Sequence, residues 1–124
     1  LGGEMYVPNY NIMGVAKAAL ESSVRYLSAE FGSIGVRVNA LSAGPVKTLA
    51  FKGIAGSDVL LKINKYRSPM KRNITLEEVG SAGLYLASSL SSGVTGETHH
   101  VDGGVHCVAI SKEDAKYYLD VDVK

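Results

Sequence analysis

The chain has 124 residues, of which 46% are hydrophobic and 20% charged, the composition of an ordinary globular protein. Thirteen basic residues offset twelve acidic ones, and the net charge of +1 does not indicate a nucleic-acid-binding or membrane-surface protein. A single cysteine, Cys107, excludes an intramolecular disulfide and a cysteine metal cage. Because no apolar run is long enough to span a membrane and no signal peptide opens the chain, we expect a cytoplasmic protein.

The first predicted element is one long helix over residues 9–31. Its apolar side chains recur at three- and four-residue steps, which predicts a helix with one buried stripe. The stripe consists of Ile12, Val15, Ala16, Ala19, Leu20, Val24, Leu27 and Phe31. Pro8 with Asn9 is a start signal, and Gly32 with Gly35 is a stop signal.

Strands and helices then alternate. Residues 36–42 are rich in β-branched side chains and predict a strand, and residues 97–102 predict a last one. Residues 48–73 show little periodicity, so we expect only short helical turns there. Thr75 and Glu78 have the spacing of a capping box and predict the start of another helix. This order predicts an α/β fold with a parallel sheet.

Two strands are too few for a buried parallel sheet, and the chain starts at Leu1 rather than at an initiator methionine. We therefore expect the C-terminal half of a doubly wound, Rossmann-like sheet whose first half precedes Leu1. In this interpretation residues 1–110 belong to a single domain, and residues 111–124 form a C-terminal tail.

The most informative pair is Tyr10 and Lys17. Seven residues are close to two helical turns, so both side chains project from one face of the helix, about 10.5 Å apart along its axis. A lysine ammonium near a phenol favours the phenolate, which suits a tyrosine that stabilises a developing oxyanion. Spacing alone leaves the alternative of an ordinary surface helix, in which Lys17 pairs with Glu21.

Three segments together resemble one family. Residues 8–17 (Pro-Asn-Tyr-Asn-Ile-Met-Gly-Val-Ala-Lys) and residues 36–50 resemble the active-site helix and the following strand and loop of enoyl-acyl-carrier-protein reductases, in the short-chain dehydrogenase/reductase superfamily. Residues 101–104 (Val-Asp-Gly-Gly) resemble the superfamily's last strand. Most members of the superfamily have a tyrosine four residues before the lysine, where this chain has Met13. Enoyl reductases have it seven residues before, where Tyr10 stands.

The resemblance implies an NADH-dependent enzyme that reduces the trans-2 double bond of enoyl thioesters, with NADPH as an alternative cofactor. It implies that Tyr10 and Lys17 are catalytic and that Lys17 also binds the cofactor. The implied cofactor loop follows the first strand: Ala43, Gly44, Pro45, Val46, Lys47, Thr48, Leu49 and Ala50. The implied substrate-binding residues are Tyr10, Met13, Ala50, Phe51, Ile54 and Leu60.

Acyl carrier protein and a homotetramer are the implied partners, and residues 1–124 alone are expected to be inactive. Between Lys47 and Arg72 seven basic residues face one acidic residue, giving 7 − 1 = +6, a charge that could attract an acidic carrier protein or simply form a solvated face. The alternatives to an enoyl reductase are another short-chain dehydrogenase, such as a 3-oxoacyl-acyl-carrier-protein reductase, and a non-catalytic element of an oligomer. His99 and His100 alternate along the last strand and are not expected to bind one metal.

Overall fold

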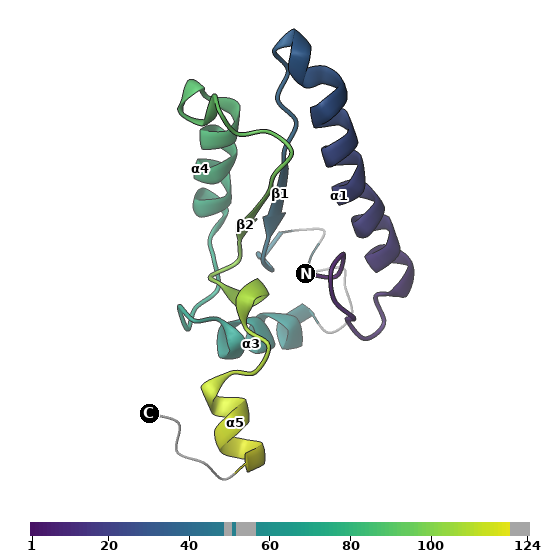
Figure 1. The fold of residues 1–124 in the computed structure, drawn as a ribbon. Helices are drawn as coiled ribbons and strands as arrows, with labels where there is room; N and C mark the ends of the chain where they lie inside the picture. Colours follow the sequence, from purple (N-terminus) through teal and green to yellow (C-terminus); the bar gives the residue numbers. More distant parts are fainter. Residues whose placement is uncertain (49–50, 52–56, 120–124) are drawn as a thin grey trace. The chain divides into compact units, whose positions relative to one another are not determined.

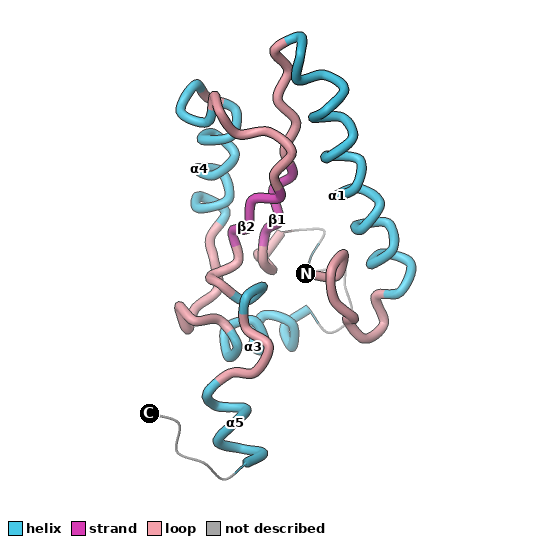
Figure 2. The backbone as a smooth tube through the Cα atoms, viewed as in Figure 1, coloured by secondary structure: helices cyan, strands magenta, loops and turns pink. Residues whose placement is uncertain are grey.

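The structure, a computed structural model, describes residues 1–48, 51 and 57–119 (Figures 1 and 2). Its elements are α1 (Asn11–Phe31), β1 (Ala40–Ala43), α3 (Ser57–Arg67), α4 (Leu76–Ala87), β2 (Thr98–Val101) and α5 (Lys112–Leu119), with 3₁₀ turns at Gly32–Ile34, Ser89–Ser91 and Val105–Cys107. The chain divides into two compact units. The first unit is Leu1–Ser42 with Gly80–His99, and the second is Ala43–Val79 with the residues from His100 onward. None of the described helices is both long and apolar enough to cross a membrane.

The two strands pair in parallel, as the sequence predicts. The amide of Ala40 donates to the carbonyl of Glu97 at 2.8 Å, and the amide of Gly44 donates to the carbonyl of Val101 at 2.9 Å. Both partners advance four residues in the same direction between these two bonds, which defines a parallel register. The first strand is shorter than predicted, because residues 36–39 lie outside β1.

Before Ala40, side-chain oxygens accept the amides that a backbone ladder would pair: the amide of Val38 donates to Oγ1 of Thr95 at 3.0 Å, and the amide of Glu97 donates to Oδ1 of Asn39 at 3.1 Å. Arg37, in the same segment, is bonded to the end of α4. Its guanidinium donates hydrogen bonds to the carbonyl of Leu86 at 2.8 Å and to Oγ of Ser91 at 2.9 Å. These groups lie at and just beyond the C-terminal end of α4, where helix carbonyls have no partner within the helix. This charged side chain connects the segment before β1 to the end of α4.

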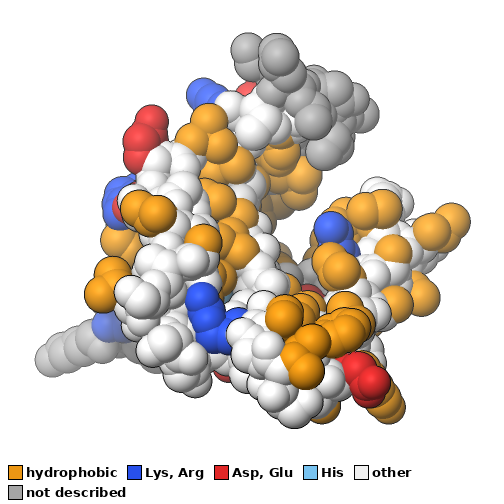
Figure 3. Space-filling model, turned by 90° about the horizontal axis from the view of Figure 1, so that it is seen from above, with side chains coloured by type: hydrophobic (Ala, Val, Ile, Leu, Met, Phe, Trp, Pro, Cys, Tyr) orange, Lys and Arg blue, Asp and Glu red, His pale blue; other side chains and the backbone are white. Residues whose placement is uncertain are grey.

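The long helix α1 is present, but the prediction of a buried stripe is wrong for the residues that the structure describes. Val24 is the one buried side chain of this helix, whereas Ile12 is 85% exposed and Val15 is 73% exposed. Hydrophobic side chains are accordingly visible at the surface in the space-filling view (Figure 3). The periodicity identifies the apolar face correctly, but the described part of the first unit supplies too little surface to cover that face.

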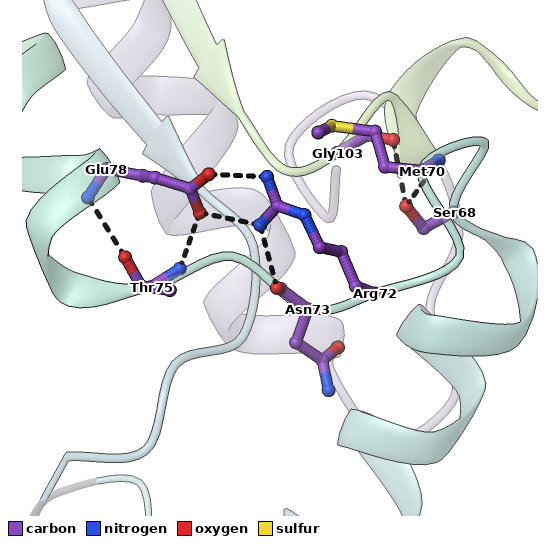
Figure 4. Close-up of polar contacts among 7 residues, drawn as sticks. All are labelled: Ser68, Met70, Arg72, Asn73, Thr75, Glu78 and Gly103. Carbon is purple, nitrogen blue, oxygen red and sulfur yellow. Dashed lines mark hydrogen bonds and ion pairs between the residues drawn. The ribbon is translucent and has the colours of Figure 1, made fainter.

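The prediction of short helical turns between residues 48 and 73 is also wrong, because α3 runs for 11 residues. Its end is fixed by Ser68, which is fully buried. The Ser68 hydroxyl donates to the carbonyl of Gly103 at 2.9 Å and accepts from the amide of Met70 at 3.2 Å (Figure 4). Gly103 has φ +69°, and a Cβ there would lie 2.6 Å from Oγ of Ser68. This turn therefore requires glycine on both conformational and steric grounds.

The predicted capping box at the start of α4 is confirmed. The amide of Glu78 donates to Oγ1 of Thr75 at 3.2 Å, and the amide of Thr75 donates to Oε2 of Glu78 at 2.8 Å (Figure 4). Glu78 of this capping box has a further partner, Arg72, which the sequence did not predict. The Arg72 guanidinium donates to both carboxylate oxygens of Glu78, at 2.9 and 2.5 Å. Hydrogen bonds from Arg72 and from the Thr75 amide lower the pKa of Glu78 to about 2.

A pH dependence of stability follows from this carboxylate. Because the folded-state pKa of Glu78 lies below the ordinary value of 4.5, its ionised form stabilises the fold above pH 4.5, and this contribution is lost as the pH falls towards 2. Glu78→Gln should lower the free energy of unfolding at pH 7 and flatten its decline between pH 4.5 and 2. Denaturant unfolding at a series of pH values measures both effects. Arg72→Met should flatten the same interval, and an unchanged slope in both variants would contradict this assignment.

Candidate active site

Tyr10 stands at the start of α1 as its N-cap residue, without a side-chain capping bond. Its carbonyl accepts the amide of Gly14 at 2.6 Å, and this bond begins the helix. The half-buried ring lies over the N-terminal turn, because a Cβ on Gly2 would come within 2.5 Å of Cδ1 of Tyr10. A residue larger than glycine at position 2 would therefore displace the ring, and the turn preceding α1 sets the direction of the tyrosine.

A pocket of about 250 Å³ lies beside this ring. It is lined by the N-terminal turn and by one side of the first turns of α1. The lining residues are Gly2, Gly3, Met5, Tyr6, Val7, Tyr10, Asn11, Gly14, Val15 and Ala18. Most of the lining consists of apolar side chains or backbone. Tyr10 and the exposed Tyr6 are the two lining residues that carry a phenolic hydroxyl.

Lys17 and Met13 do not line this pocket. At about 100° per residue, Lys17 lies almost in line with Tyr10 along α1, and Met13 lies to one side of that line. Lys17 is exposed, and Met13 is 48% exposed. The half-buried Tyr10 and the exposed Met13 and Lys17 thus lie on one side of α1.

The predicted cofactor loop begins where β1 ends, in the second unit. Gly44 approaches the residue that follows β2 so closely that a Cβ on it would lie 3.1 Å from the Cα of Asp102. The amide of Thr48 donates to the carbonyl of Val46 at 3.0 Å, and its Oγ1 accepts the amide of Phe51 at 3.1 Å. Ala43 and Lys47 are exposed, whereas Pro45, Val46 and Thr48 are half-buried. The loop is therefore a tight backbone turn at the carboxyl end of a parallel strand, where open α/β sheets bind ligands.

The predicted substrate-binding residues are only partly visible. Phe51 is half-buried, and Leu60 is 41% exposed on α3. Ala50 and Ile54 lie outside the described residues, as does Leu49 of the predicted cofactor loop.

The positive charge between Lys47 and Arg72 is partly neutralised in the structure. Arg72 is paired with Glu78, and Nζ of Lys71 lies 2.6 Å from Oε1 of Glu113. Lys62 and Lys65 are exposed on α3. The positive face is therefore smaller than the sequence count of +6 suggests, because two of its seven cations have carboxylate partners outside the counted range.

Sequence reasoning missed a cluster around Asp102. The carboxylate of Asp102 accepts the amides of Gly104 at 2.8 Å and His106 at 2.9 Å, and lies 3.1 Å from Nδ1 of His106. Burial opposes its ionisation, but the bonds from His106 and Gly104 lower its pKa overall. The His106 ring stacks on that of His100 at 4.0 Å. The four-residue spacing of Asp102 and His106 was the available signal, and within the described residues no cluster of metal-binding side chains is found.

The arrangement is shared with solved structures. The enoyl-acyl carrier protein reductase of Bacillus cereus, solved with NADP+ and an indole naphthyridinone, superposes with a TM-score of 0.84 at 51% identity over 89% of this chain and 43% of its own. The reductase of Anaplasma phagocytophilum, solved with NAD, gives a TM-score of 0.80 at 52% identity over 88% of this chain and 39% of its own. The fold is therefore the Rossmann-like α/β fold of short-chain dehydrogenases/reductases, as the sequence predicts.

The sequence comparisons narrow this class to one family. The profile described as enoyl-(acyl carrier protein) reductase matches residues 1–106. A Rhizobium meliloti protein named enoyl-(acyl-carrier-protein) reductase (NADH) 1 is 59% identical over 92% of this chain, and a Staphylococcus aureus reductase named as using NADPH is 55% identical over 87%. The chain belongs to the enoyl-acyl-carrier-protein reductase family, which confirms the predicted resemblance. It spans 42% of the length of each of these two relatives.

Proposed function

We propose that the protein containing residues 1–124 reduces the trans-2 double bond of enoyl-acyl-carrier-protein thioesters with NADH, the last step of the fatty acid elongation cycle. The observation that carries this proposal is the placement of Tyr10, which begins α1 and lines a pocket, while Met13 occupies the usual tyrosine position of the superfamily. A methionine cannot donate a proton, so a carbonyl reductase of the ordinary type would lack its acid. The family of the chain supports the same reaction.

In this proposal Tyr10 acts on the thioester oxygen. Addition of hydride to the β-carbon moves negative charge onto that oxygen, so a hydrogen bond from the phenol stabilises the transition state more than the ground state. The ring is held by the turn at Gly2, which limits the reorganisation needed during the reaction. Met13 and Leu60 are both partly exposed and apolar, which suits contact with an acyl chain. The same role is proposed for Phe51, and for Ala50 and Ile54 outside the described residues.

Lys17 is proposed to donate hydrogen bonds to the ribose hydroxyls of the nicotinamide half of the cofactor and to favour the developing negative charge electrostatically. When bound, NADH supplies the hydride. Lys17 fits this task because it is exposed and lies on the same side of α1 as Tyr10. Residues 43–48 are suited to cofactor binding, because they form a tight turn at the carboxyl end of β1 and open α/β sheets bind their ligands at such ends. The relatives named above include both NADH and NADPH enzymes.

This proposal has three further parts. The protein forms a homotetramer, it is located in the cytoplasm, and residues 1–110 belong to a single catalytic domain that is followed by a tail at residues 111–124. All three rest on the family to which the chain belongs. The described α5 lies within the proposed tail.

The complete gene product should oxidise NADH in the presence of a crotonyl thioester, followed as loss of absorbance at the nicotinamide band. Activity with a 3-oxoacyl thioester alone would instead identify a ketone reductase of the same superfamily. Failure of the purified, folded protein to act on either thioester would favour a non-catalytic role in an assembly.

Docking of the carrier protein gives a separate prediction. Lys62 and Lys65 are exposed on α3, and an acidic carrier protein would be attracted to them. The double variant Lys62→Glu/Lys65→Glu should raise the KM for crotonyl-acyl-carrier protein about tenfold and leave the KM for crotonyl-coenzyme A within about twofold. Steady-state assays at low ionic strength measure both. Equal effects on the two substrates would contradict docking at this face.

A further inference from the structure

The C-terminal helix α5 is bound by charge to the end of α3. Nζ of Lys71, just beyond α3, lies 2.6 Å from Oε1 of Glu113 and also donates to the carbonyl of Tyr66 at 3.0 Å. The ammonium thus joins the first turn of α5 to the last turn of α3. Hydrogen bonding to Lys71 lowers the pKa of Glu113, which favours its carboxylate form.

A second connection uses Arg67, the last residue of α3. Its Nη2 donates to the carbonyls of Val108 at 3.0 Å and Ala109 at 3.2 Å, in the segment that leads into α5. Nε of Arg67 is buried without a hydrogen-bond partner among the described residues. Arg67 is therefore held by two backbone carbonyls, which can be reached only while the segment before α5 stays against α3.

The start of α5 is itself well defined. The amide of Asp114 donates to Oγ of Ser111 at 3.0 Å, and the amide of Ser111 donates to Oδ2 of Asp114 at 3.1 Å, which together form a capping box. Ser111 is 5% exposed. Desolvation and the negative charge of Asp114 raise the pKa of Tyr66, so this tyrosine of α3 also lies in the field of α5. The Lys71–Glu113 ion pair and the Arg67 hydrogen bonds therefore connect the C-terminal end of α3 to α5 and to the segment before it, and the capping box defines where α5 begins.

We propose that α5 and the segment before it hold α3 in position for the substrate. The ion pair of Glu113 with Lys71 and the hydrogen bonds from Arg67 to the carbonyls of residues 108 and 109 make this connection. α3 carries Leu60, assigned above to acyl binding, so this inference rests on the proposed function. The family profile ends at residue 106, and α5 therefore lies outside the part of the chain that the profile matches. Lys71, Arg67 and Glu113 are positioning residues, because they act on the substrate only through the placement of α3.

The test compares Lys71→Met and Glu113→Gln in the complete gene product by hydrogen exchange and steady-state kinetics. Each variant should speed amide exchange in α3 about two- to fivefold and raise the KM for crotonyl thioester by a similar factor, with kcat within about twofold. The charge-exchanged double variant Lys71→Glu/Glu113→Lys can re-form the ion pair but not the bond to the Tyr66 carbonyl, so it should recover part of both values. Lys112→Met removes a lysine from the exposed side of α5 and serves as the matched control, which should change neither value.

Unchanged amide exchange in α3 of these two variants would overturn the proposal that α5 positions α3. Faster amide exchange with an unchanged KM would also overturn it. An increase caused equally by Lys112→Met would also overturn it, because the effect would then follow the charge of α5 rather than the contact with Lys71. Failure of the proposed function is distinguishable, since it is seen as absence of crotonyl reduction by the unmodified protein. In that case α3 exchange alone decides whether α5 holds α3.

Discussion

Tyr10→Phe is expected to lower kcat for crotonyl thioester about 100- to 1000-fold, the usual loss when one hydrogen-bond donor to a developing oxyanion is removed. The KM should change much less, because the bond is proposed to strengthen only as charge reaches the thioester oxygen. Phenylalanine retains the ring that lies over Gly2, so the N-terminal turn and the start of α1 should be preserved. Steady-state kinetics of the complete gene product, with circular dichroism to verify folding, measures the effect.

Tyr6→Phe is the matched control for this experiment. Tyr6 lines the same pocket, but it is 88% exposed and does not stand at a position that the family resemblance assigns to catalysis. Its turnover should stay within about threefold of the unmodified protein. If Tyr6→Phe and Tyr10→Phe were equally impaired, the pocket lining as a whole rather than the Tyr10 hydroxyl would be responsible. An active Tyr10→Phe variant would remove Tyr10 from the mechanism.

Lys17→Met is the substitution with the second largest expected effect. Hydrogen bonds from a charged donor contribute about 1.5–3 kcal/mol, so loss of the ammonium should raise the KM for NADH about 10- to 100-fold. A smaller decrease in kcat should accompany it, because the positive charge near Tyr10 is also lost. Methionine keeps an unbranched side chain of good helix propensity, and the exposed position on α1 makes a folding defect unexpected. Titration of NADH in the steady-state assay and direct cofactor binding by fluorescence both measure the change.

Arg25→Met provides the matched control on the same helix, since Arg25 is also exposed and carries the same charge. It should leave the KM for NADH unchanged. A similar rise in both variants would indicate a general electrostatic attraction of the cofactor, and no change in Lys17→Met would exclude Lys17 from cofactor binding.

Much of the candidate site can be predicted from the sequence because its signals are local. The seven-residue spacing of Tyr10 and Lys17 depends only on helix geometry, and α1 indeed runs from Asn11 to Phe31. The capping box of Thr75 and Glu78 joins residues three apart and forms as predicted. Such features depend on backbone conformation over one or two turns, so they persist whatever packs around them.

The sequence by itself therefore determined the long helix, the parallel α/β order and the position of the tyrosine relative to the lysine. Only the tertiary structure decided which charges meet and which apolar side chains are covered. The ion pair of Lys71 with Glu113 and the bonds of Arg37 to the end of α4 join residues more than 40 positions apart. The exposed Ile12 shows the same principle, because periodicity identifies an apolar face but not the surface that packs on it. Long-range partners are selected by the folded backbone, and no spacing along the chain encodes them.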